Sequence, residues 1–224
     1  MSEPFAFIVF EGLDCGGKSH QSKRVVERLQ AEGRDVLQVS DPGTTELGVM
    51  IRKILLDASN KPHMCPYSEL MLFAAARASL VTYIQTEMRK RPGLIIVSDR
   101  FIHSTLAYQG FGRKLDRRKV VSSIEASCTV YPTLTLYLEV DEGTIIERMA
   151  KRYNEGQIAD RLEQENVMFR DRVREGYKYH TQNAYWKYGE IETIDGNPAG
   201  DTVFEEVIRA VNRHLEDRKE LFTT

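Results

Sequence analysis

The sequence predicts an α/β fold in which a parallel β-sheet of about five strands is covered by helices on both faces. Three observations lead to this prediction. Strand-like and helix-like patterns alternate along most of the 224 residues, the strand-like runs are apolar, and polar or glycine-rich segments follow the first three of them. Continuous apolar runs are typical of strands that are buried on both faces, as in parallel sheets covered by helices.

Five runs are predicted to be strands because they are rich in residues that favour extended backbone. The first, at 5–10, reads Phe-Ala-Phe-Ile-Val-Phe and is apolar throughout. The others are at 35–39, 94–97, 133–140 and 190–194. Ligands of such sheets bind outside the carboxyl ends of the strands, so we expect the segments after these runs to form one crevice.

The segments between the strands carry apolar residues at helical spacing. They are at about 18–32, 45–56, 66–89, 115–127, 142–151 and 162–185, and a final helix contains Phe204, Val207, Ile208, Val211 and Leu215. Residues 152–160 are charged and show no apolar periodicity, which predicts an exposed loop. We therefore expect a single domain over residues 1–224, with a mobile lid at about 151–161.

The overall composition is typical of a soluble globular protein, with 42% hydrophobic and 29% charged residues. A net charge of -2 gives no reason to expect a nucleic-acid partner. The run at 5–10 is too short for a signal peptide or a membrane span, which predicts a cytoplasmic protein with no membrane partner. The three cysteines and five histidines are scattered and suggest neither a disulfide framework nor a zinc site.

A glycine-rich loop follows the first predicted strand and precedes the first predicted helix. It matches the pattern G-x-x-x-x-G-K-[ST] through Gly12, Leu13, Asp14, Cys15, Gly16, Gly17, Lys18 and Ser19. Such a loop turns backbone N–H groups toward a phosphate at the start of a helix. Lys18 would contact the β/γ phosphates of ATP and the Ser19 hydroxyl would bind Mg²⁺. The pattern predicts a P-loop NTPase-type sheet, but it does not separate a kinase from a GTPase or a motor ATPase.

Four further segments occur in a set order after the loop. They are Asp41–Gly48 with Ile51-Arg52, Leu72–Arg77, Asp99-Arg100-Phe101 with Ser104–Gly110, and Asp160–Glu165. Together with the loop they resemble thymidylate kinases, enzymes that transfer the γ-phosphoryl group of ATP to dTMP with Mg²⁺. The resemblance covers nearly the whole chain. It is similar to the bacterial type through Ala107-Tyr108-Gln109-Gly110 and Asp160–Glu165.

The resemblance implies an acceptor site built from the second and third segments. Phe73 would stack on thymine, and Arg77 lies on the same helix face four residues later. Arg100 would hold the dTMP phosphate through its planar guanidinium, and Arg52 would be a second arginine of the site. Core packing for Phe73, a surface ion pair for Arg100 and an exposed helical position for Arg52 are the alternative interpretations.

Other residues of the site follow from the same resemblance. Ser104 and Gln109 match groups near the pyrimidine edge, although both could equally be ordinary loop residues. Asp14 matches the carboxylate that accepts the 3′-hydroxyl of the deoxyribose. Asp99 would lie near Mg²⁺, so Ser19 and Asp99 form the expected metal site.

Catalysis of phosphoryl transfer depends on positioning and on positive charge at the transferring group. Some family members place an arginine in the phosphate loop, but the corresponding position here is Cys15. In the bacterial type the lid supplies the arginine instead. We therefore expect Arg152 and Arg161 to join Lys18 and Arg100 as catalytic residues, the alternative being a solvated charged loop.

Several departures keep other functions open. Ser40-Asp41-Pro42-Gly43 stands where the bacterial pattern has Arg-Glu-Pro-Gly. The arginine is absent and the acid is one methylene shorter, so strict preference for dTMP does not follow from the resemblance. Thymidylate kinase is the expected function, and a kinase of another nucleoside monophosphate, such as dUMP, dGMP or dCMP, and a P-loop ATPase or switch are the alternatives. The family is commonly homodimeric. The helix at 66–89 offers a candidate surface through Met71, Leu72, Ala74, Ala75, Ala78 and Leu80, which core packing would explain equally well.

Overall fold

The structure, a computed structural model, describes residues 6–183 and 188–222. Its centre is a five-stranded sheet in the order β2-β3-β1-β4-β5, and every neighbouring pair of strands is parallel. The strands are β1 (Ala6–Glu11), β2 (Val36–Ser40), β3 (Ile95–Asp99), β4 (Leu134–Glu139) and β5 (Glu190–Asp195). The predicted α/β fold with a five-stranded parallel sheet is confirmed.

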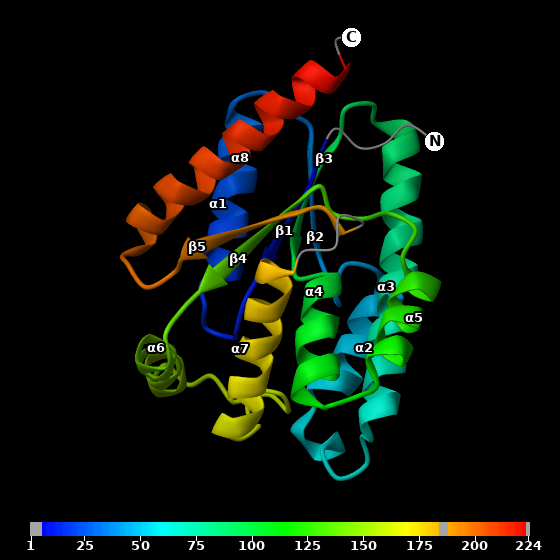
Figure 1. The fold of residues 1–224 in the computed structure, drawn as a ribbon, viewed down its shortest axis with the longest axis vertical. Coiled ribbons are helices and arrows are strands. Elements are labelled where there is room, and N and C mark those ends of the chain that lie inside the picture. Colours follow the sequence, from blue (N-terminus) through cyan, green and yellow to red (C-terminus); the bar gives the residue numbers. More distant parts are fainter. Residues whose placement is uncertain (1–5, 184–187, 223–224) are drawn as a thin grey trace.

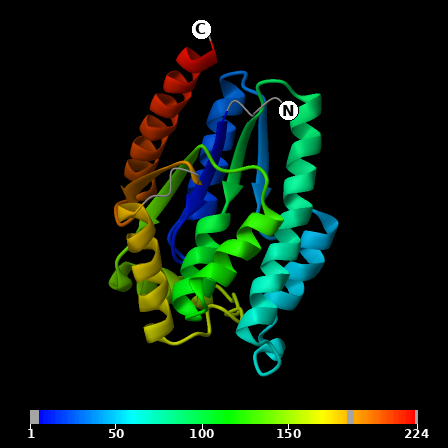
Figure 2. The same cartoon turned by 45° about the vertical axis from the view of Figure 1, so that its right-hand side comes forward.

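Helices cover both faces of the sheet, as Figures 1 and 2 show. Alternate residues of β1 divide the core, since Ile8 and Phe10 belong to one apolar cluster and Phe7 and Val9 to another. The first cluster is covered by α1 (Lys18–Ala31) and α8 (Gly200–Phe222), and the second by α3 (Pro66–Lys90) and α5 (Arg117–Ser127). Both faces of β1 are thus fully buried, in keeping with its continuously apolar sequence.

The remaining helices lie mostly toward the carboxyl ends of the strands (Figure 1). They are α2 (Glu46–Leu56), η1 (Ala58–Asn60), α4 (Ile102–Thr105), η2 (Leu106–Gly112), α6 (Glu142–Asn154) and α7 (Val167–Gln182). In the part of the chain that the structure describes, no helix has the length and apolarity needed to cross a membrane.

The sequence did not predict the helix pair α4 and η2 between β3 and α5. The π-helix η2 packs closely against α7, and two glycines permit the approach. A Cβ atom at Gly112 would lie 2.8 Å from the ring of Phe169, and one at Gly176 would lie 2.9 Å from Ala107. Glycine lowers helix propensity, so the residues that allow this packing also hid the helix in the sequence.

Two boundaries near the predicted lid are corrected. α6 continues to Asn154, so Arg152 lies in its last turn instead of in a loop. α7 begins at Val167, since the Asn166 side chain caps its first turn by accepting a hydrogen bond from the Phe169 amide at 2.9 Å. The predicted end of this helix at residue 185 lies outside the described residues.

Candidate active site

The phosphate loop connects the end of β1 to the first turn of α1. Gly12, Cys15 and Gly17 have positive φ angles, of 140°, 62° and 91°. Glycine is required at the first of these positions, where a Cβ atom would lie 2.6 Å from the carbonyl oxygen of Leu138. The Nζ atom of Lys18 donates to the Leu13 carbonyl at 2.6 Å. The loop therefore has the conformation that its sequence pattern predicts.

The expected Mg²⁺ ligands lie together at the amino end of α1. The Ser19 hydroxyl donates to Oδ2 of Asp99, whose Oδ1 is buried and finds no hydrogen-bond partner among the described residues. A hydroxyl and a carboxylate with a free oxygen are ligands that Mg²⁺ prefers. These two residues therefore fit the metal that accompanies ATP.

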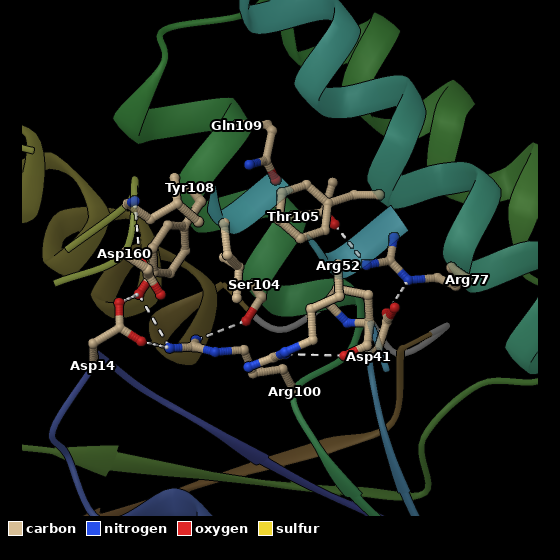
Figure 3. Close-up of a pocket in the computed structure, with 14 residues that line it drawn as sticks. Asp14, Asp41, Arg52, Arg77, Arg100, Ser104, Thr105, Tyr108, Gln109 and Asp160 are labelled. Atoms are coloured by element: carbon tan, nitrogen blue, oxygen red, sulfur yellow. Dashed lines mark hydrogen bonds and ion pairs between the residues drawn. The ribbon is translucent and has the colours of Figure 1, made fainter. Parts of the chain in front are cut away.

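Two adjoining pockets open beyond the carboxyl ends of the strands. The phosphate-loop pocket, of ≈ 720 Å³, is lined by Lys18, Ser19 and Asp99 among others. The inner pocket, of ≈ 60 Å³, is the narrower, and Figure 3 shows the side chains that surround it. Four residues line both pockets: Asp14, Arg52, Arg100 and Asp160. A group bound in the inner pocket would therefore face a group bound on the phosphate loop.

Arg100 is the central cation between the pockets. Its Nη1 donates to the Gly12 carbonyl at 2.9 Å and to Ser104 Oγ at 3.0 Å, and its Nη2 donates to Asp14 Oδ1 at 2.5 Å. Burial would raise the pKa of Asp14, but Arg100 and Lys18 outweigh it and lower that pKa to about 2. Asp14 is therefore an ionised partner of Arg100, and the alternative of a surface ion pair for Arg100 does not hold.

Glu11 is a site residue that sequence reasoning missed. Its carboxylate is fully buried and accepts from the amides of Phe101 (2.8 Å) and Ser104 (3.0 Å), and from the hydroxyls of Ser104 (2.6 Å) and Tyr177 (2.9 Å). It thereby supports the segment that carries Arg100. The available signal was an acid at the end of an otherwise apolar strand, directly before the phosphate loop.

Arg77 forms one wall of the inner pocket and is only 1% exposed. Its Nε donates to Asp41 Oδ2 at 2.6 Å and its Nη2 to Thr105 Oγ1 at 2.7 Å (Figure 3). Its Nη1 has no hydrogen-bond partner among the described residues, although it is buried. Phe73 lines the same pocket, so the predicted ring and cation do meet there. The pocket thus offers an unused hydrogen-bond donor beside an aromatic ring.

Gln109, Ser104 and Arg52 also line the inner pocket. Gln109 is 1% exposed and donates through Nε2 to Oε1 of Glu69 at 2.8 Å. Arg52 donates to the Pro42 carbonyl at 3.0 Å and faces both pockets. Tyr108 and Asp160 line the inner pocket as well, and the sequence singled out neither as an individual site residue.

The two predicted lid arginines have different surroundings. Arg152 lines the phosphate-loop pocket, and its Nη1 donates to Cys15 Sγ at 3.0 Å and to Glu163 Oε1 at 2.9 Å. Arg148, one turn earlier on α6, lines the same pocket and donates to the Gly196 carbonyl at 2.8 Å. A cation from α6 is thus placed beside Cys15, the loop position that lacks an arginine.

Arg161 lines neither pocket. Its side chain is 2% exposed, its Nε donates to the Leu55 carbonyl at 2.6 Å, and its Nη2 forms an ion pair with Glu69 Oε2 at 2.7 Å. This placement corrects the prediction that Arg161 reaches the transferring phosphate. The sequence does not reveal the contact between Arg161 and Glu69, because Glu69 is 92 positions earlier in the chain.

Comparison with known proteins decides the family of the chain. Residues 10–214 match the family model described as thymidylate kinase. The chain belongs to the thymidylate kinase family. The match covers every residue that lines the two pockets, so the resemblance seen in the sequence is confirmed at the level of the family.

Individual members of the thymidylate kinase family align over nearly their whole length. A thymidylate kinase of Geobacter sulfurreducens is 37% identical over 90% of this chain and 95% of its own. One of Pelotomaculum thermopropionicum is 37% identical over 94% of both chains, and one of Thermosipho africanus is 35% identical over 94% of this chain and 99% of its own.

Proposed function

We propose that this protein is an ATP:dTMP phosphotransferase that produces dTDP. The observation that carries the proposal is the inner pocket of a thymidylate kinase family member, in which Phe73 lies beside an unpaired donor, Arg77 Nη1, and an acceptor, Gln109 Oε1. Thymine presents a C4 carbonyl that accepts and an N3–H that donates. Cytosine presents a donor at C4 and an acceptor at N3. The pocket therefore favours thymine over cytosine.

The two nucleotides occupy the two adjoining pockets in this proposal. The triphosphate of ATP lies on the loop from Gly12 to Ser19, with Lys18 at its β/γ phosphates. Ser19 and Asp99 hold Mg²⁺, which neutralises charge on the phosphates when it is bound. The dTMP phosphate lies against Arg100 and Arg52, because these cations line both pockets.

The sugar and the transition state have their own residues. Asp14 accepts a hydrogen bond from the 3′-hydroxyl of dTMP, since it is ionised and lies between the pockets. Arg152 supplies positive charge to the transferring phosphoryl group from the end of α6. Its contact with Cys15 Sγ holds the guanidinium beside the phosphate loop. Because Cys15 is not a carboxylate, this contact does not neutralise the positive charge of Arg152.

A panel of acceptors tests the function. ADP release is measured in a coupled assay with ATP and Mg²⁺, with dTMP, dUMP, dCMP, dGMP or no acceptor. We expect ADP with dTMP, and a lower rate with dUMP, which presents the same imide edge without the methyl group. ADP formation without any acceptor would favour an ATPase or switch, and a preference for dCMP or dGMP would replace the assigned substrate.

The exposed apolar face of α2 and α3 suggests a homodimer. Leu47, Met50 and Met71 are 47%, 56% and 51% exposed, and Ile54 is 45% exposed. Leu80, which the sequence placed on the candidate surface, is 2% exposed and belongs to the core instead. Large exposed apolar side chains on adjoining helices are typical of interfaces. Sedimentation equilibrium of the wild type and of M50E/M71E tests this, with a dimer expected for the first and a monomer for the second.

A further inference from the structure

Glu69 is a buried acid outside the two pockets that contacts a pocket residue. It lies in the first turn of α3 and is 1% exposed. Its Oε1 accepts from Gln109 Nε2 at 2.8 Å and from Arg113 Nε at 3.0 Å, and its Oε2 accepts from Arg113 Nη2 at 2.8 Å and faces Arg161 Nη2 at 2.7 Å. Glu69 itself lines neither pocket. Its influence on the site must therefore act through Gln109.

The protonation state of Glu69 determines whether it can donate a hydrogen bond to Gln109 or only accept one. Burial alone would raise the pKa of this carboxyl group, but Arg113, then the hydrogen bond from Gln109 and then Arg161 outweigh burial and hold the pKa below its usual value. The carboxylate is ionised and can only accept hydrogen bonds. The two ends of a glutamine amide have the same shape, so the partner decides which end faces it. Gln109 must therefore turn its NH₂ group to Glu69.

The carbonyl end of Gln109 is left for the pocket. Oε1 accepts no hydrogen bond within the described residues, and Figure 3 shows the amide directed toward the other labelled side chains of the inner pocket. We propose that Glu69 is a specificity-determining positioning residue: by fixing the amide of Gln109, it makes the pocket accept a base N–H and reject a base ring nitrogen that is itself an acceptor. This inference rests on the proposed function, and it explains how the assigned base edge is selected.

Arg113 and Arg161 both contact the carboxylate of Glu69. Arg113, just after η2, also pairs with Glu165 at 2.8 Å, and Arg161 is held by the Leu55 carbonyl. Arg113 donates to both oxygens of Glu69 and Arg161 faces Oε2, so the carboxylate is held in place with Oε1 in contact with the amide of Gln109. The arginine that the sequence assigned to catalysis thus belongs to the buried cluster around Glu69.

Glu69→Gln tests the proposal because it keeps the size of the side chain and removes its acceptor-only character. A neutral amide at position 69 can either accept or donate, so the Gln109 amide is free to present either end to the base. The readout is the ratio of kcat/KM for dTMP to that for dCMP. We expect this ratio to fall at least tenfold, mainly through a raised KM for dTMP and a lowered KM for dCMP, with the KM for ATP unchanged.

Arg161→Met is the matched control, because it damages the same buried cluster without touching the bond between Glu69 and Gln109. It should lower the melting temperature and leave the ratio within about threefold of the wild type. If Glu69→Gln does not fold at the assay temperature, Glu69→Asp takes its place, since it keeps the charge that both arginines need but draws the carboxylate away from Gln109. The same tenfold fall is expected.

Gln109→Met provides the decisive coupling experiment. Without an amide at position 109, Glu69→Gln should change the ratio by less than twofold, whereas a general structural effect would lower it equally in both backgrounds. An unchanged ratio in folded Glu69→Gln or Glu69→Asp, or in Gln109→Met, overturns the proposal. A wild-type protein that releases no ADP with dTMP would instead refute the proposed function, so the two failures are distinguishable.

Discussion

Two Asp-Arg pairs in this chain look alike in the sequence, but their arginines have different surroundings. Asp99-Arg100 lies at the carboxyl end of β3, of which Asp99 is the last residue, and Asp160-Arg161 precedes α7. Both aspartates line the phosphate-loop pocket. Arg100 lines both pockets, whereas Arg161 turns away into a buried contact with Glu69. A cation is catalytic or structural according to its neighbours, and the dipeptide alone does not reveal which.

The backbone explains part of the difference. Arg100 has a positive φ of 67°, a conformation that non-glycine residues rarely adopt. Its amide donates to the Phe10 carbonyl at 2.9 Å, and its carbonyl accepts from Ser98 Oγ at 2.7 Å. The amide of Arg161 donates to the Leu56 carbonyl at 2.9 Å, in a tight turn after Asp160. Strained backbone, which is common at active sites, occurs at the arginine that lines both pockets.

Replacement of Arg100 should have the largest effect on activity. We expect Arg100→Gln to lower kcat/KM for dTMP on the order of 10⁴-fold, since the variant loses one of the two arginines that line both pockets, the one bound to Asp14. Steady-state kinetics with varied dTMP measure this loss. Circular dichroism and the KM for ATP serve as controls for the fold, and a loss below tenfold would contradict the central role of Arg100.

Arg152→Ala should come next and should act on a different kinetic parameter. We expect kcat to fall about 10³-fold while the KM values for ATP and dTMP change less than fivefold, because a cation at the transferring phosphoryl group acts on the transition state. Cys15→Ser, which leaves Arg152 in place, is the comparison variant and should retain most of kcat. A wild-type kcat in Arg152→Ala would remove this residue from the mechanism.

The sequence predicted the local parts of the site and failed on the long-range ones. The phosphate loop is a local pattern with an obligatory geometry, and it was found where expected, between β1 and α1. Arg161 was assigned to the wrong role and Glu11 was missed, because the partners of both residues are distant in the chain. Glu69 faces Arg161 across 92 positions, and Tyr177 faces Glu11 across 166. No periodicity encodes such pairs.

In the fold, too, local sequence patterns fail where long-range contacts decide the structure. Each end of the five strands was predicted to within two residues, because the strands are rich in residues that favour extended backbone. Helices α4 and η2 were not predicted, since Gly110 and Gly112 weaken the helical pattern and tertiary packing against α7 supplies the stability. Tertiary contacts, which the local pattern does not contain, decided this segment.

Arg161→Met should lower stability and leave activity nearly unchanged, whereas Arg100→Gln should lower activity. We expect the free energy of unfolding to fall by about 3 kcal/mol, because the substitution leaves part of a buried ion pair uncompensated. Urea titration followed by circular dichroism measures the loss. In folded protein kcat should stay within about threefold of the wild type. A large loss of kcat with unchanged stability would return Arg161 to the catalytic group.

A change of pH should give the smallest effect, and it separates Lys18 from the arginines, which keep their charge at all accessible pH values. Burial, and then Arg100, lower the pKa of Lys18 to about 8. The positive charge is therefore present below pH 8 and is lost above it, whereas bound phosphates favour the charged form and raise the pKa in the complex.

We expect the affinity for a non-hydrolysable Mg²⁺–ATP analogue to fall about tenfold between pH 7 and pH 9. Calorimetry in buffers of different ionisation enthalpy should also detect proton uptake on binding near pH 8. Arg152→Ala should show the same pH dependence, and an affinity that stays constant from pH 7 to pH 9 would show that Lys18 is not the titrating cation.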